Sequence, residues 1–169
     1  MKKALFLDLD HTLIAPRSGN TFPQDTDDWQ FMRNVLSHLS SWVYNNPDSP
    51  IVLVTNQGGV AAGFQTKESI ENRLTDVIKA IKNSMSTYHV EIHPYVSYQN
   101  DGDRKPLPGM AHKAAVALGL DLSKCLMVGD MASDQGFAQH AGMPFEWAET
   151  FFNNKEKAHY APPLNVREG

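Results

Sequence analysis

The chain has 169 residues, of which 41% are hydrophobic and 20% are charged, and its formal net charge is −4 at pH 7. This balance is typical of a globular protein with one well-formed core. No run of about 18 apolar residues occurs, which excludes a membrane-spanning helix. The negative charge argues against a large non-specific nucleic-acid surface. The single cysteine, Cys125, excludes an intrachain disulfide and a thiolate zinc cluster.

The first apolar run follows two lysines and is broken at Asp8, too early for the core of a signal peptide. We therefore expect an intracellular protein, cytoplasmic by default, with no membrane partner. The composition leaves the oligomeric state open.

Short apolar runs alternate with helical patterns along the chain. Buried strands are predicted at residues 4–7, 51–54, about 92–98 and 125–128. Helical spacing of apolar residues predicts helices at 30–44, 67–86, 109–118 and 134–141. Thr66 is a suitable N-cap, and Gly119 and Gly142 are suitable C-terminal stops. This alternation predicts an α/β protein, a three-layer Rossmann-like fold with a parallel sheet and helices on both faces. We expect one domain at residues 1–152 and a polar tail at 153–169.

Polar residues that could take part in catalysis or ligand binding follow each predicted strand. They are Asp8, Asp10 and Thr12 after the first, Thr55 and Asn56 after the second, Arg104 and Lys105 after the third, and Asp130 and Asp134 after the fourth. In open α/β sheets these strand ends meet at one edge, where ligands bind. Alternation along a strand would direct Asp8 and Asp10 to the same side, where their charges repel unless a cation lies between them. The sequence therefore predicts a metal ion or a charged substrate there.

The motifs DLDHT, TN, K before P and GDMASD, in this order, resemble those of the haloacid dehalogenase (HAD) superfamily of phosphohydrolases. The resemblance implies that Asp8 attacks phosphorus to form an aspartyl-phosphate and that Asp10 is the general acid and base. It implies Mg²⁺ as the cofactor, held by Asp8, Asp130 and the backbone carbonyl of Asp10.

The same resemblance gives roles to the remaining polar residues. Thr12, in the first motif, would bind the substrate, and Thr55 and the amide of Asn56 would bind phosphate oxygens. Lys105 would neutralise the transferring group. Asp134 would orient Lys105 or a metal-bound water from outside the ligand shell.

Wider stretches resemble the 3′-phosphatase domain of polynucleotide kinase–phosphatases: RSGNTFPQDTDDW, TNQGGV, DRKPLPGM and AGMPFEWAETFF. The segments between the motifs are too short for a large cap domain, so we expect an open site that admits a polymer. The implied partner is a nucleic-acid 3′ end, with Arg17 and Arg104 holding the adjacent backbone phosphate. The chain departs from the family pattern at His11, where a glycine is common, and in the second half of GDMASD. The kinase motif GxxxxGK[ST] is absent from the sequence.

Two alternatives remain open. Small-molecule phosphatases acting on histidinol phosphate or heptose bisphosphate are similar in TNQGGVAAG and KPLPGM, but they carry a Cys/His zinc loop where this chain has SYQNDGDRKP. The chain could also be a non-catalytic binding module, although the predicted nucleophile Asp8 is retained. Four aromatic residues could stack on bases or fill the core: Trp29, Phe64, Tyr95 and Tyr98.

Overall fold

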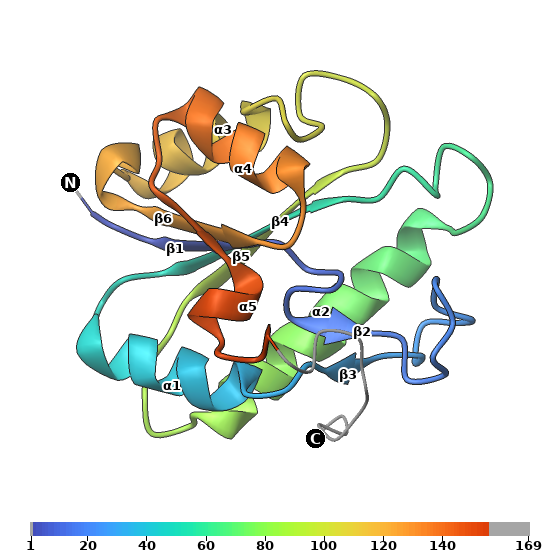
Figure 1. The fold of residues 1–169 in the computed structure, drawn as a ribbon, viewed down its shortest axis with the longest axis horizontal. Coiled ribbons are helices and arrows are strands. Elements are labelled where there is room, and N and C mark those ends of the chain that lie inside the picture. Colours follow the sequence, from blue (N-terminus) through green and yellow to red (C-terminus); the bar gives the residue numbers. More distant parts are fainter. Residues whose placement is uncertain (1, 156–169) are drawn as a thin grey trace.

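The computed structural model describes residues 2–155 of the chain and has a five-stranded parallel sheet at its centre (Figure 1). Its strand order is β5-β4-β1-β6-β7, with bounds β1 Leu5–Leu7, β4 Ile51–Asn56, β5 Ile92–Ser97, β6 Leu126–Gly129 and β7 Phe145–Trp147. The predicted α/β fold class is confirmed. Because β4 and β6 lie on opposite sides of β1, the chain leaves the sheet in two directions at the carboxyl end of β1, which is where such folds bind ligands.

Helices cover both faces of the sheet (Figure 1). One face packs against α1 (Val35–Asn45) and α2 (Lys67–Ser84), and the other packs against α3 (Gly109–Leu118) and α4 (Ala132–Ala141). Alternate β1 residues serve different cores, since Leu5 and Leu7 join the first and Phe6 joins the second. A strand buried on both faces needs an unbroken apolar run, which explains the sequence ALFL.

The predicted helix ends are correct where capping chemistry is explicit. The Thr66 side chain accepts a hydrogen bond from the Ser69 amide, and Gly119 and Gly142 adopt the left-handed conformation that ends α3 and α4. A short 3₁₀ turn, η1 (Leu122–Lys124), leads into β6.

The predicted helix over residues 30–44 is wrong at its start. Residues Gln30–Phe31 form β3, which pairs antiparallel with β2 (Ile14–Ala15), and α1 begins only at Val35. Asn34 has a φ of 67°, a left-handed conformation that a helix cannot include. Phe31 has helical spacing from Val35, but its pairing with Ile14 decides its conformation.

Two short elements were not predicted from the sequence. They are β7, which is only three residues long, and the four-residue α5 (Ala148–Phe151) that follows it. Residues 156–169 of the predicted tail lie outside the described part of the chain. Within that part, Asn154 is buried and its side-chain amide donates to the Arg33 carbonyl at 3.0 Å. The boundary at residue 152 stays a prediction. No helix of the described residues is long and apolar enough to cross a membrane.

Candidate active site

The predicted polar residues gather around the carboxyl end of β1. The strand itself ends at Leu7, so strand alternation does not explain how Asp8 and Asp10 come to lie near each other. The Asp8 amide still bonds to the Val128 carbonyl of β6 at 3.1 Å, and the chain then turns sharply at His11, whose φ is 62°. Turn geometry therefore sets the relative placement of Asp8 and Asp10.

Lys105 is the most constrained charge in the site. Its ammonium donates to Asp8 Oδ1 at 2.8 Å, to Asp134 Oδ1 at 2.7 Å and to the Val54 carbonyl at 2.8 Å, while the residue is only 4% exposed. These acceptors match its three N–H donors. Burial lowers the pKa of Lys105, but the charges of Asp8 and Asp134 outweigh burial, so the net pKa is raised and the ammonium stays charged.

Asp134 is fully engaged by the protein. Its Oδ1 accepts from Lys105, and its Oδ2 accepts from the amides of Asp130 and Met131, both at 3.0 Å. A Cβ on Gly129 would lie 2.4 Å from the Asp134 side chain, so only glycine permits this approach. The contact with Lys105 is compatible with one of the two roles predicted for Asp134, which stays a prediction.

Asp8 and Asp130 face each other across the hydroxyl of Thr12, which lies 3.2 Å from Asp8 Oδ2 and 3.3 Å from Asp130 Oδ1. Carboxylate oxygens of Asp8, Asp130 and Asp134 all lie within 4.8 Å of one another. Burial, followed by the hydrogen bond and charge of Asp8, raises the pKa of Asp130 to about 8. Burial also raises the pKa of Asp8, but Lys105 outweighs it and the net pKa is lowered.

The raised pKa of Asp130 favours the protonated form of its carboxyl at neutral pH when no cation is present. A divalent cation could replace that proton. The available ligands are hard carboxylate oxygens, with room for water on the open side, and this donor set fits Mg²⁺.

Asp10 belongs to a separate hydrogen-bonded group. Gln57 Nε2 donates to Asp10 Oδ2 at 2.9 Å and to Thr55 Oγ1 at 2.8 Å. Burial and the charge of Asp8 raise the pKa of Asp10 despite the Gln57 bond. Gln57 is not among the site residues predicted from the sequence, although it follows the TN motif directly. A raised pKa favours the protonated carboxyl that a general acid requires.

The Asn56 side chain contacts the backbone of Lys105, which the sequence alone does not predict. Its side-chain oxygen accepts from the Lys105 amide at 2.9 Å, and its side-chain nitrogen donates to the Lys105 carbonyl at 3.1 Å. This reciprocal pair fixes the loop after β5 against the end of β4.

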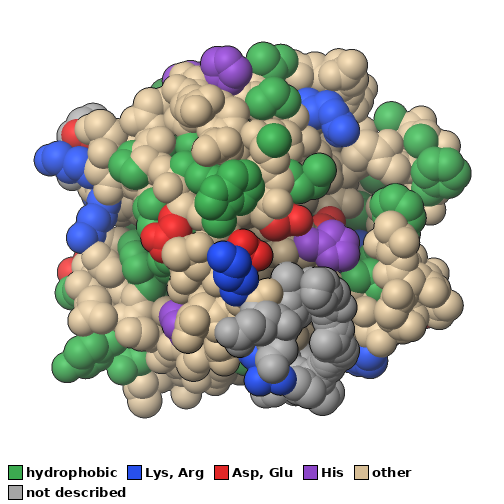
Figure 2. Space-filling model, viewed as in Figure 1, with side chains coloured by type: hydrophobic (Ala, Val, Ile, Leu, Met, Phe, Trp, Pro, Cys, Tyr) green, Lys and Arg blue, Asp and Glu red, His purple; other side chains and the backbone are tan. Residues whose placement is uncertain are grey.

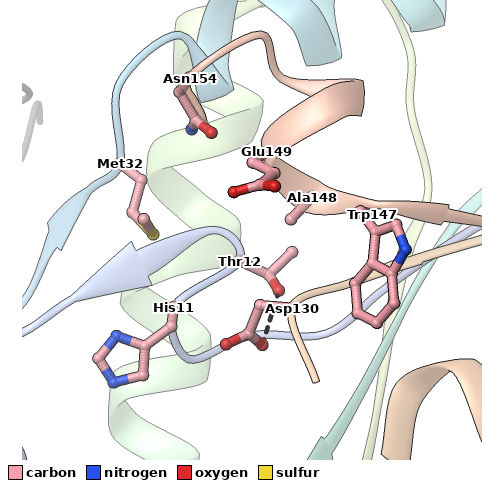
Figure 3. A pocket seen from close by; sticks show the side chains of 8 residues that line it. All are labelled: His11, Thr12, Met32, Asp130, Trp147, Ala148, Glu149 and Asn154. Carbon is pink, nitrogen blue, oxygen red and sulfur yellow. Dashed lines mark hydrogen bonds between the residues drawn. The ribbon is translucent and has the colours of Figure 1, made fainter. Parts of the chain in front are cut away.

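Two hollows meet at the site. A cavity of about 380 Å³ is lined by Thr12, Asp130 and Glu149, and Figure 3 shows Glu149 across it from Asp130. A larger groove of about 1150 Å³ is lined by Asp10 and Asn56, and His11 lines both hollows. Figure 2, viewed as in Figure 1, shows acidic side chains in a row across the middle of the face in view. Asp130 therefore faces the cavity, whereas Asp10 faces the groove.

The structure separates the two arginines predicted to bind the strand. Arg104 lines the groove and packs on Gly58, where a Cβ would lie 3.0 Å from its Nη1. Arg17 is not among the described residues that line the groove, and its Nη2 donates to the Trp29 carbonyl at 3.1 Å. Its predicted strand contact stays a prediction.

The aromatic candidates also differ. Trp29 is 1% exposed and belongs to the core, whereas Phe64 is 84% exposed on the groove. Tyr95 and Tyr98 are partly buried and pack against the cores.

The sheet topology gives the chain the fold of solved HAD-superfamily hydrolases, such as the one from Ehrlichia chaffeensis, which has a TM-score of 0.56 and 16% identity. D,D-heptose 1,7-bisphosphate phosphatase from B. bronchiseptica, solved as a complex with magnesium and phosphate, has a TM-score of 0.74 and 24% identity. The match covers 98% of this chain and 90% of the other. It establishes a shared fold.

The model of the family described as polynucleotide kinase 3 phosphatase matches residues 3–152, and the chain belongs to this family. The bifunctional polynucleotide phosphatase/kinase of Schizosaccharomyces pombe is 33% identical over 162 residues, which are 89% of this chain and 38% of that protein. D-glycero-β-D-manno-heptose-1,7-bisphosphate 7-phosphatase of Mesorhizobium japonicum is 28% identical, over 85% of this chain and 68% of that protein. The resemblance drawn from the motifs is confirmed.

The Asp130 pKa predicts how pH affects the stability of the metal-free protein. Because the pKa is raised from 3.8 to about 8, the folded state binds more protons than the unfolded state between these values. Stability should therefore fall as pH rises through about 8. We expect Tm to fall between about pH 6 and about pH 9 without metal, and Mg²⁺ to raise Tm more at the higher pH. Asp130→Asn should flatten this slope, whereas the exposed Asp76→Asn should not; an unchanged slope in Asp130→Asn would contradict the assignment.

Gly129→Ala should damage the site through Asp134. The new methyl group would overlap the carboxyl of Asp134, so we expect a loss of about 1–3 kcal/mol in the free energy of unfolding and a lower kcat as Lys105 shifts. Urea denaturation and steady-state kinetics measure the two effects. Gly102→Ala is the matched control, because a Cβ there would meet no atom within 4 Å. Equal behaviour of the two variants would refute the close-packing argument.

Proposed function

We propose that this chain is a Mg²⁺-dependent phosphomonoesterase that removes a 3′-terminal phosphate from a nucleic-acid strand through an aspartyl-phosphate on Asp8. The observation that carries the proposal is the division of the site between two hollows. Asp10, the group suited to protonate the leaving oxygen, opens into the larger groove. The leaving group must therefore occupy that groove, and the groove has the size and openness for a strand end.

The chemistry follows from the positions of the side chains. A carboxylate oxygen of Asp8 attacks phosphorus, the bond from phosphorus to the 3′ oxygen breaks, and Asp10 donates its proton to that oxygen. In the second step Asp10 takes a proton from water, the water oxygen bonds to phosphorus, and the Asp8 carboxylate is released with inorganic phosphate. Lys105 stabilises charge on the transferring oxygens and holds Asp8 in place.

The metal site is proposed to consist of carboxylate oxygens of Asp8 and Asp130, with the backbone carbonyl of Asp10 as a third ligand. Bound Mg²⁺ would neutralise the adjacent carboxylates and attract the phosphate dianion. Thr12 bonds both carboxylates, and Asp134 keeps Lys105 directed at the same point. Thr55 and the amide of Asn56 are proposed to bind phosphate oxygens, with Gln57 fixing Thr55 and Asp10 relative to each other.

Two further observations support a polymeric substrate. The groove is rimmed by Phe22 and Phe64, which are 75% and 84% exposed and offer faces on which bases can stack. Arg104 lies in the same groove and suits a phosphate oxygen. The relative from S. pombe carries a polynucleotide phosphatase name, which agrees with this choice.

A small-molecule phosphatase of the heptose-bisphosphate type is the second candidate. The relative from M. japonicum and the fold of the B. bronchiseptica enzyme favour it. A sugar bisphosphate would leave most of a groove of about 1150 Å³ unfilled, and its exposed phenylalanines would have no partner. Because a strand end would fill the groove better than a sugar bisphosphate, we prefer the nucleic-acid substrate.

Asp8→Asn should abolish turnover, because the amide has nearly the same shape but cannot attack phosphorus. We expect phosphate release to fall at least about 1000-fold while the circular dichroism spectrum stays native. Asp76→Asn removes the same charge from an exposed residue of α2 that does not line the groove, and it should keep full activity. Retention of more than a few per cent of the rate in Asp8→Asn would overturn the assignment of the nucleophile.

A substrate panel distinguishes the two candidate functions. With Mg²⁺ present, kcat/KM should be highest for a 3′-phosphorylated oligonucleotide and lower for the 5′-phosphorylated isomer, histidinol phosphate and a heptose bisphosphate. Chelator should stop turnover of every substrate, and added Mg²⁺ should restore it. A higher kcat/KM for the sugar bisphosphate would establish the second candidate instead.

A further inference from the structure

The core-facing side of α2 contains one charged residue. Its other buried residues are apolar, namely Ile70, Leu74, Val77, Ala80 and Ile81, and Arg73 lies in the same stripe with only 3% of its surface exposed. Removing a guanidinium from water is costly unless a charged partner and hydrogen bonds compensate for it. The surroundings of Arg73 therefore show what the side chain is placed to bind.

The contacts of Arg73 satisfy only part of its bonding capacity. Its Nη1 donates to Gln65 Oε1 at 3.3 Å and its Nη2 to the Asp25 carbonyl at 3.1 Å, so both acceptors are neutral. Within residues 2–155, no carboxylate lies within 4.0 Å of Arg73, and its buried Nε has no hydrogen-bond partner. A guanidinium has five N–H donors, so Arg73 can still bind an anion.

The position of Arg73 connects it to the groove of the proposed reaction. It lines that groove together with Asp10 and Arg104. Its two acceptors belong to different walls, because Gln65 ends the loop after β4 and Asp25 lies in the loop between β2 and β3. Figure 1 shows the N-terminal half of α2 reaching these loops. Arg73 thus joins the two walls beside the proton donor.

Other charges near Arg73 do not replace an anionic ligand. Burial lowers the pKa of Arg73, and Asp10, Asp28 and Asp25 oppose this effect only from a distance. Asp28 is already occupied, since it accepts from the Ser18 amide at 2.7 Å, the Ser18 hydroxyl at 2.6 Å and the Gln24 amide at 2.9 Å. Asp10 accepts from Gln57.

We propose that Arg73 and Arg104 form a subsite for the internucleotide phosphodiester that precedes the 3′-terminal nucleotide, an inference that rests on the proposed function. When Asp10 protonates the leaving 3′ oxygen, the next phosphate of the strand lies one sugar away and must share the groove with Asp10. Two guanidinium groups on that groove offer planar donors that match phosphate oxygens. Arg73 is held in advance by Gln65 and Asp25, so little side-chain freedom is lost on binding.

The subsite makes the enzyme selective for strands over single nucleotides. A nucleoside 3′-monophosphate has the scissile phosphate but lacks the internucleotide phosphodiester. It should therefore react with a similar kcat and a higher KM than a 3′-phosphorylated dinucleotide. Arg73 is a specificity-determining residue in this scheme and takes no part in bond cleavage.

The decisive experiment changes the substrate before it changes the protein. The wild-type enzyme is assayed with Mg²⁺ on a 3′-phosphorylated dithymidine whose linkage is either a phosphodiester or a neutral methylphosphonate. We expect the neutral linkage to raise KM at least about tenfold, because one charge-assisted contact is lost. The value of kcat should change less than about twofold. Equal KM values for the two substrates would overturn the subsite.

Variants then assign the effect to Arg73. Arg73→Met should raise KM for the phosphodiester substrate to the value of the methylphosphonate and change KM for the nucleoside 3′-monophosphate much less, while Arg73→Lys should recover part of the discrimination. Lys79→Met removes an exposed charge from the same helix and should retain wild-type discrimination. If Arg73→Met still discriminates fully between the phosphodiester and the methylphosphonate, the role of Arg73 is overturned. If circular dichroism shows that Arg73→Met is unfolded, Arg73→Lys decides instead. Full wild-type discrimination in Arg73→Lys would show that the contact does not need the guanidinium, which overturns the proposed role equally.

The same assay separates this inference from the function on which it rests. If neither dinucleotide is hydrolysed while a heptose bisphosphate is, the proposed function and the subsite both fail. If both dinucleotides are hydrolysed with equal KM, the polynucleotide 3′-phosphatase function stands and the subsite alone fails.

Discussion

The buried ammonium of Lys105 is the interaction on which the rest of the site depends. It joins β4, through the Val54 carbonyl, to Asp8 after β1 and to Asp134 in α4. A single charge thus fixes three segments that are far apart in sequence. Leaving either carboxylate without this partner would bury an uncompensated charge, which proteins tolerate poorly. The surrounding residues can be understood as supports for this arrangement.

Several of those supports are backbone features. The Asn56 side chain forms hydrogen bonds with both the amide and the carbonyl of Lys105. Gly129, which has no side chain, leaves the space that Asp134 requires. The amides of Asp130 and Met131 complete the bonding of Asp134. These contacts come from the ends of β4 and β6, so the parallel sheet fixes the loop that carries Lys105 and the first turn of α4 that carries Asp134.

The electrostatics of the site divide its carboxylates into two groups. Burial and the neighbouring Asp8 raise the pKa of Asp130 to about 8, whereas Lys105 keeps the pKa of Asp8 low, so a cation between the two carboxylates would relieve the cost of ionising Asp130. Asp10 has a raised pKa for a different reason, burial beside the charge of Asp8, and it faces the groove. The proposed metal site and the proposed proton donor are therefore neighbouring but separate carboxylates, and the groove opens on the side of Asp10.

The sequence by itself determined the fold class, four of the five strands of the central sheet and the group formed by Asp8, Asp130, Asp134 and Lys105. Strand alternation with helices and short motifs at strand ends are local signals, and parallel strands bring their carboxyl ends together in any such sheet. Only the tertiary structure decided that Phe31 pairs in β3, that Gln57 bridges Asp10 and Thr55, and that Arg73 rather than Arg17 lines the groove. Each of these depends on contacts between distant segments. The helical spacing of Arg73 resembles that of its apolar neighbours, and nothing local shows that a groove lies above it.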